Sequence, residues 1–176
     1  MFDLPEQVNI DGRDYPVRTD FRVILEIFVM LNDPDLMDGD KVEALLQMFY
    51  ITRPDDTEKA LQAFADFIEP RRRVNGKRPR LIDWEEDFDL IAAGVNHVLG
   101  TECRALPYLH WRTFLAAFLE ISPESLLCQV LNIRRKIKTG EKLEKWERRW
   151  YQKNRHLVDL PQKLSSSEKA LLEEWT

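Results

Sequence analysis

The residues of this sequence best suited to metal binding or nucleophilic chemistry are its histidines and cysteines. The three histidines are His97, His110 and His156, and the two cysteines are Cys103 and Cys128. A zinc site usually takes closely spaced pairs of such ligands, and the sequence has no such pair. It also has no nucleophile elbow, phosphate-binding glycine loop or dinucleotide fingerprint. We therefore expect no metal site, no cofactor and no enzymatic activity. An enzyme remains a third hypothesis, because catalytic partners can come from distant parts of a chain.

The acidic residues between 33 and 40 resemble a calcium-binding loop only superficially. Asp33, Asp35 and Asp38 do not keep the alternate-ligand spacing, and no bidentate glutamate follows at the required position. Aspartate is also common in loops and at helix starts, where it accepts local backbone hydrogen bonds. We expect this second role here.

A basic segment, RRRVNGKRPR at 71–80, could contact phosphates. Its candidate phosphate-contacting residues are Arg71, Arg72, Arg73, Lys77, Arg78 and Arg80. The segment lacks the interleaved aromatic residues on which bases would stack. We favour a solvated loop, or one neutralised by the acidic residues of 83–89. A nucleic-acid-binding or packaging accessory protein is the alternative function, although nucleic acid is the less favoured partner.

The strongest indication of a binding surface is a set of large apolar residues in the charged segment 141–176. Leu143, Trp146, Trp150 and Leu157 lie on one side of an expected helix over 141–157, and Leu171, Leu172 and Trp175 lie near the end of the chain. Tryptophan buries a large area and often anchors interfaces. These seven residues are therefore our candidate partner-binding set. The same periodicity would also suit residues that close the protein's own core.

Charge and composition favour a soluble intracellular protein. Residues 1–70 carry 6 basic and 16 acidic side chains, a net charge of −10, whereas the whole chain has −5. This asymmetry favours an oriented protein partner. Two unpaired cysteines favour a reducing compartment. The start of the chain lacks the features of a signal peptide, and no apolar stretch is long enough to span a membrane.

The elements that would position these residues are mostly helices. Asp11-Gly12 predicts a type I′ turn in a small N-terminal hairpin. Apolar periodicity and capping residues predict helices over 20–31, 40–51, 54–70, 83–100, from 107, 122–139, 141–157 and 168–175. Asp20 is the expected cap of the first of these helices, and Gly100 is the expected end of the fourth. The apolar stripe of the helix over 122–139 comprises Leu126, Val130, Ile133 and Ile137. We expect an all-α, compact bundle of about seven to eight helices with that hairpin. A globular domain over 1–140 would carry a charged amphipathic helical arm over 141–176.

The expected core combines the apolar faces of these helices. Its members are Phe21, Ile24, Phe28, Leu45, Phe49, Phe64, Phe88, Val95, Trp111, Phe114, Phe118 and Val130. His110 precedes the core-facing Trp111, so we expect it to be buried and hydrogen-bonded.

Four short motifs from residue 87 onward carry a family resemblance. They are Asp87-x-x-x-Ile91-x-Ala93, Glu102-Cys103-Arg104, Leu109-His110-Trp111-Arg112-Thr113-Phe114 and Ile133-Arg134-Arg135-Lys136. This pattern resembles the bacteriophage family named for gene product fifteen, found in tailed phages and prophages of Gram-positive bacteria. Cys103 and Arg112 depart from the family pattern.

The resemblance implies a function in tail assembly. Genes of this family lie in the tail module, between the tail-tube and tape-measure genes, which implies a tail-assembly chaperone. Such a protein would cover the tape-measure protein in the host cytoplasm until the tail tube polymerises, and would be absent from the mature virion. Further partners would be a second copy of the chain or another tail-assembly chaperone, without a membrane.

Overall fold

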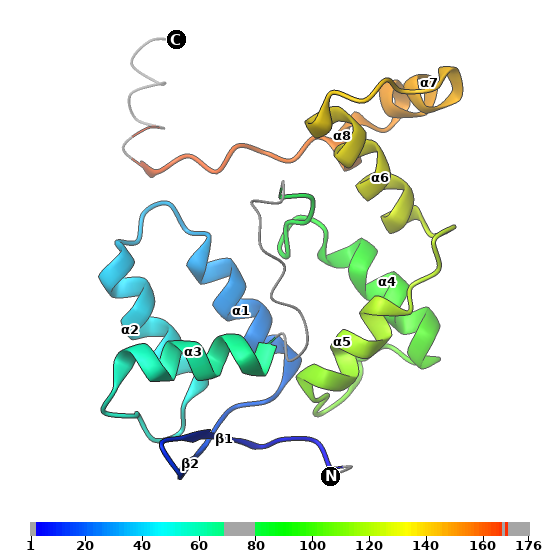
Figure 1. Ribbon diagram of the computed structural model, residues 1–176. Coiled ribbons are helices and arrows are strands. Elements are labelled where there is room, and N and C mark those ends of the chain that lie inside the picture. The colour runs from blue at the N-terminus through cyan, green and yellow to red at the C-terminus, as the bar shows by residue number, and fades with distance from the viewer. Residues whose placement is uncertain (1–2, 69–79, 167, 169–176) are drawn as a thin grey trace. The chain divides into compact units, whose positions relative to one another are not determined.

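The computed structural model describes residues 3–68, 80–166 and 168, which fall into two compact units (Figure 1). Unit 1 comprises residues 1–75, 108–112 and 163–176, and unit 2 comprises 76–107 and 113–162. The described residues form eight α-helices, one short 3-10 helix and a two-stranded sheet. The expected fold class, mostly helical with a small N-terminal hairpin, is confirmed.

The hairpin opens unit 1. β1 (Gln7–Ile10) and β2 (Arg13–Pro16) pair antiparallel, with Ile10 opposite Arg13. Asp11 and Gly12 both have positive φ, 52° and 84°, as the predicted type I′ turn requires.

Three helices complete the first part of unit 1: α1 (Phe21–Leu31), α2 (Asp38–Phe49) and α3 (Thr57–Ile68). Asp20 caps α1 as expected, accepting a 2.9 Å hydrogen bond from the Arg22 N–H. α2 ends before the predicted Ile51. Its last expected residues leave the helix because Tyr50 pairs with Val17 and the Ile51 N–H donates to the Pro16 carbonyl at 3.1 Å.

The core of unit 1 is largely aromatic. The Phe49 ring lies edge-on to Phe64 and Phe67, with centroid distances of 5.0 and 5.2 Å. Trp111 is buried beside Phe28, at a centroid distance of 5.7 Å. The predicted core residues of this unit are buried, except Phe28, which is half-buried.

Unit 2 contains most of the later helices. They are α4 (Phe88–Leu99), the 3-10 helix η1 (Cys103–Ala105), α5 (Trp111–Leu119, whose first two residues belong to unit 1), α6 (Leu126–Thr139), α7 (Lys145–Lys153) and α8 (Arg155–Val158). Gly100 and Gly140 follow α4 and α6 with φ of 68° and 71°, so both end a helix in the left-handed conformation that favours glycine.

Three of these helices begin later than their sequences predict. Residues 84–87 form a turn before α4, because Asp83 accepts hydrogen bonds from the Glu85 and Glu86 N–H groups. α5 starts at Trp111 rather than after Pro107, since the Leu109 carbonyl accepts from the Phe21 N–H within unit 1. Ser125 caps α6 in place of the predicted 122–124 segment.

The predicted helix over 141–157 is in fact two shorter helices. Residues 141–144 precede α7, and Asn154 separates α7 from α8 with φ of −124°. The predicted final helix over 168–175 lies outside the described residues apart from Glu168. Glu168 forms a reciprocal cap with Ser165: the Ser165 hydroxyl accepts from the Glu168 N–H at 3.2 Å, and the Glu168 carboxylate accepts from the Ser165 N–H at 2.7 Å.

The core of unit 2 includes the predicted Val95, Phe114 and Val130, all buried, whereas Phe88 and Phe118 are half-buried. The buried face of α6 differs from the expected stripe. Leu127 and Arg134 are buried, while Leu126 and Ile137 are 44% and 43% exposed. The buried face of α6 includes Arg134, which the prediction left out, because the Arg134 guanidinium has buried partners, described below. Among the described residues, no helix is long and apolar enough to cross a membrane.

Candidate protein-binding surface

Arg134 fixes the C-terminal helices of unit 2. Its guanidinium is 4% exposed and makes a bidentate pair with the Asp87 carboxylate, at 2.6 and 2.8 Å. The same guanidinium donates to three backbone carbonyls, those of Leu81, Leu157 and Val158, at 2.9, 2.6 and 2.7 Å. All five guanidinium N–H donors are thereby used. One side chain of α6 thus joins the start of α4, the segment before it and α8.

A second buried ion pair holds α7 against α6. Glu147 is 1% exposed, and its carboxylate accepts from the Lys136 ammonium at 2.8 and 2.9 Å and from the Glu144 N–H at 2.8 Å. The Lys136 hydrogen bonds, together with the Glu144 N–H, hold the pKa of Glu147 below its usual value against the opposing effect of burial. Glu147 also completes a capping box with Glu144, so the pair fixes both the start and the position of α7.

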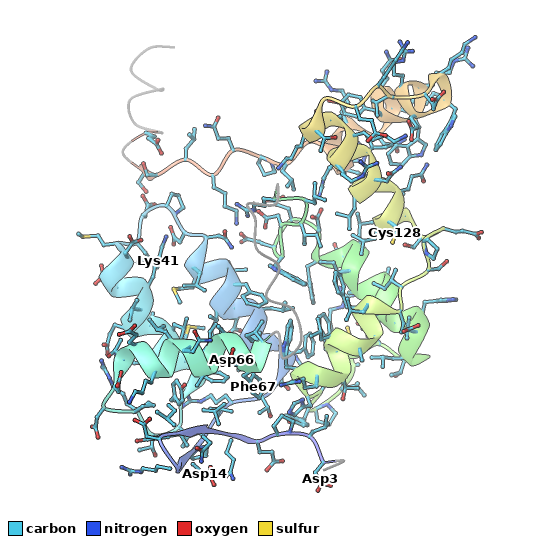
Figure 2. All side chains as sticks on the ribbon, in the orientation of Figure 1. Asp3, Asp14, Lys41, Asp66, Phe67 and Cys128 are labelled. Atoms are coloured by element: carbon cyan, nitrogen blue, oxygen red, sulfur yellow. The ribbon has the colours of Figure 1, made fainter. Side chains whose placement is uncertain are left out.

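Trp146 is the exposed aromatic residue that this arrangement presents. It directly precedes the buried Glu147, yet its own side chain is 58% exposed. It lines a groove of about 530 Å³ with residues of α6 and the turn before it: Pro123, Glu124, Cys128, Gln129 and Asn132. Figure 2 marks Cys128 near the start of α6. We call this the α6–α7 groove.

The other predicted partner-binding residues have different surroundings. Leu143, Trp150 and Leu157 are half-buried within unit 2, and Leu171, Leu172 and Trp175 lie outside the described residues. Trp146 is therefore the predicted site residue that the structure leaves most available to a partner among those it describes.

α7 also carries positive charge around Trp146. Lys145, Arg148, Arg149 and Lys153 are exposed, whereas Glu147, the only acid of this helix, is buried with Lys136. The solvent-facing side of α7 is therefore cationic and suits an acidic or amphipathic partner.

The predicted phosphate-contacting set is described at a single residue. Arg80 pairs with the buried Asp83 carboxylate, while Arg71, Arg72, Arg73, Lys77 and Arg78 lie outside the described residues. The pairing of Arg80 with Asp83 follows the expectation that acids of 83–89 neutralise part of the basic segment.

His110 is buried and hydrogen-bonded, as predicted. Its Nε2 lies 3.0 Å from the Pro5 carbonyl, and its Nδ1 accepts from the Arg112 N–H at 2.9 Å. Burial raises the pKa of the Cys103 thiol. A raised pKa lowers the fraction of thiolate, the form of cysteine that acts as a nucleophile. No group of three potential metal ligands occurs among the residues that the structure describes.

The structural roles of Arg134 and Glu147 were not predicted from the sequence. A signal existed for Arg134, because it lies four residues after Val130 and so extends the buried face of α6. Glu147 offered a weaker signal, the Glu144–Glu147 spacing of a capping box in which glutamate replaces the usual serine or threonine.

In the comparison with known protein families, residues 1–160 match the family described as Bacteriophage Gp15 protein. No curated protein and no solved structure matches the chain. The matched range includes the hairpin, all eight described helices, both buried ion pairs and Trp146. Since the match covers far more than half of the sequence, the chain belongs to the Bacteriophage Gp15 protein family.

Proposed function

We propose that this phage protein is a non-catalytic tail-assembly chaperone that binds the tape-measure protein before the tail tube polymerises. It acts in the host cytoplasm and is absent from the mature virion. The family resemblance of the sequence supports a function in tail assembly, and the α6–α7 groove is the proposed binding surface. A tape-measure protein is expected to expose long apolar helical stripes, which need temporary cover.

The observation that carries this proposal is the exposure of Trp146 on a fixed helix. The Trp146 side chain is 58% exposed, so a partner that covers it removes apolar surface from water, which favours binding. The Glu147–Lys136 pair holds the neighbouring backbone in place, so little ordering remains to be done on binding. A preorganised aromatic side chain beside a groove is typical of an interface anchor.

The surroundings of Trp146 favour an amphipathic helix as the ligand. Cys128 and Pro123 supply apolar contact within the groove, and Gln129 and Asn132 supply hydrogen-bonding groups. Lys145 and Arg149 would meet acidic residues that flank the apolar stripe of such a helix. Helix-in-groove recognition uses this combination of apolar anchors and a charged rim.

Co-expression with the tape-measure protein of the same phage tests the proposal. Trp146→Ala should greatly reduce co-purification, because truncation of an aromatic anchor commonly costs about 2 kcal/mol or more. Leu119→Ala is the matched control, since Leu119 is an apolar residue of unit 2 that is 71% exposed away from the groove lining. Equal recovery of the partner with the wild type and Trp146→Ala would contradict the proposal.

Salt dependence separates this function from nucleic-acid binding. Capture of an apolar helix should persist between 50 and 200 mM salt, whereas binding to phosphates should fall by orders of magnitude, roughly 10³-fold for six contacts. Mass spectrometry of purified virions tests the proposed localisation: the tape-measure protein should be detected and this chain should not.

A further inference from the structure

A second groove lies in unit 1, between the hairpin and α3. Its volume is about 420 Å³, and five consecutive residues of the hairpin, 7–11, line it. Successive side chains of a strand point to opposite faces, so a continuous run of lining residues means that β1 turns its backbone edge toward the groove. The opposite wall is one face of α3, with Lys59, Gln62, Ala63, Asp66 and Phe67. Figure 2 shows Asp66 and Phe67 together on this helix.

The hydrogen-bond register identifies the backbone groups at that edge. The Val17 N–H donates to the Glu6 carbonyl at 3.0 Å, so Glu6 faces β2. Antiparallel strands alternate residues that face the partner strand with residues that face away. Val8 and Ile10 therefore face β2, whereas the N–H and C=O groups of Gln7 and Asn9 face the groove. Within the described part of the chain, these four groups have no backbone partner.

The outer edge of β2 differs from that of β1. Pro16 has no N–H, and its carbonyl already accepts from the Ile51 N–H at 3.1 Å. Proline and charged residues are the usual protection of an edge strand against further pairing. β2 carries Arg13, Asp14 and Pro16, while β1, with the sequence QVNI, carries neither proline nor charge. The unprotected edge is therefore the one that faces the groove.

The two ends of the groove carry different basic residues. At one end, His110 Nε2 lies 3.0 Å from the Pro5 carbonyl, and the Arg112 guanidinium lies over the Phe67 ring, 5.4 Å from its centroid. At the other end, the Lys59 ammonium pairs with Asp11 at 2.5 Å. Cationic Arg112 thus marks the end of the groove next to the start of β1.

We propose that the β1 edge binds an extended segment of another protein as a third, antiparallel strand. N–H and C=O groups that recur every second residue, about 6.8 Å apart, are complementary to an extended polypeptide backbone. β1 is four residues long, so the segment pairs over about four residues. An antiparallel segment ends beside Pro5, where an acidic residue meets Arg112, and its apolar side chains contact the half-buried Ala63. This surface is independent of the α6–α7 groove and of the function proposed for it.

The test uses a blocked synthetic peptide, TVTVE, and nitrogen-15 NMR of the full chain. Peptide added to millimolar concentration should shift the amide signals of Gln7 and Asn9 in a saturable manner. Two further peptides carry N-methyl groups on alternate residues, one set in each. Strand pairing uses every second N–H of the added segment, so one of these peptides should lose binding and the other should retain it. Replacing the terminal glutamate by glutamine should weaken binding to the wild type but not to Arg112→Gln.

A matched pair of variants isolates the backbone edge. Gln7→Pro removes an N–H that faces away from β2, whereas Gln7→Ala shortens the same side chain and keeps that N–H. Gln7→Pro should weaken peptide binding at least about tenfold, and Gln7→Ala should bind almost as the wild type does. Both should keep the wild-type melting temperature within a few degrees, which shows that the hairpin persists.

Several results would overturn the proposal. They are an absence of Gln7 and Asn9 shifts at millimolar peptide, equal binding by both methylated peptides, and wild-type affinity in a folded Gln7→Pro. Shifts of these amides that depend on protein concentration without peptide would assign the edge to a second copy of the chain, and would also refute it.

Discussion

The two units of this protein are stabilised in different ways. Unit 1 buries aromatic and aliphatic side chains, and its buried polar residues among those described are Thr19 and His110, with no buried aspartate, glutamate, lysine or arginine. Unit 2 contains all four buried residues of charged type in the described chain: Asp83, Asp87, Arg134 and Glu147. Apolar packing therefore determines the core of unit 1, whereas buried ion pairs position the helices of unit 2.

This difference bears on binding because the proposed surface lies in the ion-paired unit. α7 has few apolar residues, with the sequence KWERRWYQK, so apolar packing alone would hold it weakly. The Lys136–Glu147 pair positions α7 while leaving Trp146 free to contact a partner. Buried ion pairs can specify one arrangement even where they add little net stability.

The largest expected effect comes from breaking the Arg134 contacts. Arg134→Ala leaves the Asp87 carboxylate buried without its guanidinium partner and three carbonyls without a donor. We expect a loss of about 5 kcal/mol from the free energy of unfolding of unit 2. Hydrogen exchange reports each unit separately, so protection should fall in α4, α6 and α8.

The neighbouring Arg135 is the control for that experiment. Its guanidinium pairs with Glu141 at 2.7 Å, with both side chains more than 40% exposed. Arg135→Ala should change stability by less than about 1 kcal/mol. A loss as large as that of Arg134→Ala would show that burial of the pair is not what matters.

Phe49→Ala removes apolar packing from the core of unit 1. The Phe49 ring is fully buried between Phe64, Phe67 and Tyr50. Its removal should cost about 4 kcal/mol through lost burial and the cavity left behind. The loss should be nearly equal at pH 4 and pH 7, since no charge is removed. Urea unfolding at both pH values measures it, and a strong pH dependence would contradict the assignment.

Glu147→Gln tests how the stability contributed by the buried Glu147–Lys136 pair depends on pH. The pKa of Glu147 is lower in the folded protein than its ordinary value of 4.5, so its contribution is present above that pH and is lost as the pH falls through the folded pKa. Glu147→Gln should lose about 2 kcal/mol at pH 7 and progressively less below about pH 4.5. A constant difference between variant and wild type across this range would exclude the proposed charge effect.

Gly94→Ala should have a smaller effect than Arg134→Ala, Phe49→Ala or Glu147→Gln. A Cβ atom at Gly94 in α4 would lie 2.6 Å from the Cδ1 atom of Ile121. Overpacking of this kind costs about 1 to 3 kcal/mol, and the better helix propensity of alanine returns up to about 1 kcal/mol. We expect a net loss of about 1 kcal/mol, restored in part by Ile121→Val. A stabilised Gly94→Ala would mean that Ile121 moves aside at no cost.

Local sequence signals predict the fold well where a single residue determines the geometry. The Asp11-Gly12 turn, the Asp20 cap and the Gly100 end of α4 depend on such residues, and all three are confirmed. Helix starts near residues 83, 107 and 122 were wrong, because each depends on a tertiary contact or on a competing local cap. At Leu109, for example, pairing with the Phe21 N–H keeps the chain extended.

The candidate site was predictable only in part. A helical stripe identifies Trp146 and Trp150 together, since both have the same periodicity. Only the packing of α7 against α6 separates an exposed Trp146 from a half-buried Trp150. The buried charges of Arg134 and Glu147 decide that packing, and hydrophobic periodicity does not register charged residues in a core.

Binding through the α6–α7 groove is tested by the affinity of the purified chain for the tape-measure segment that it captures, measured by calorimetry for the wild type and for Trp146→Ala. The variant should bind about 30-fold more weakly, the equivalent of about 2 kcal/mol, while hydrogen exchange in α6 and α7 stays at the wild-type level. An unchanged dissociation constant for a folded Trp146→Ala would contradict the claim that the α6–α7 groove is the binding surface.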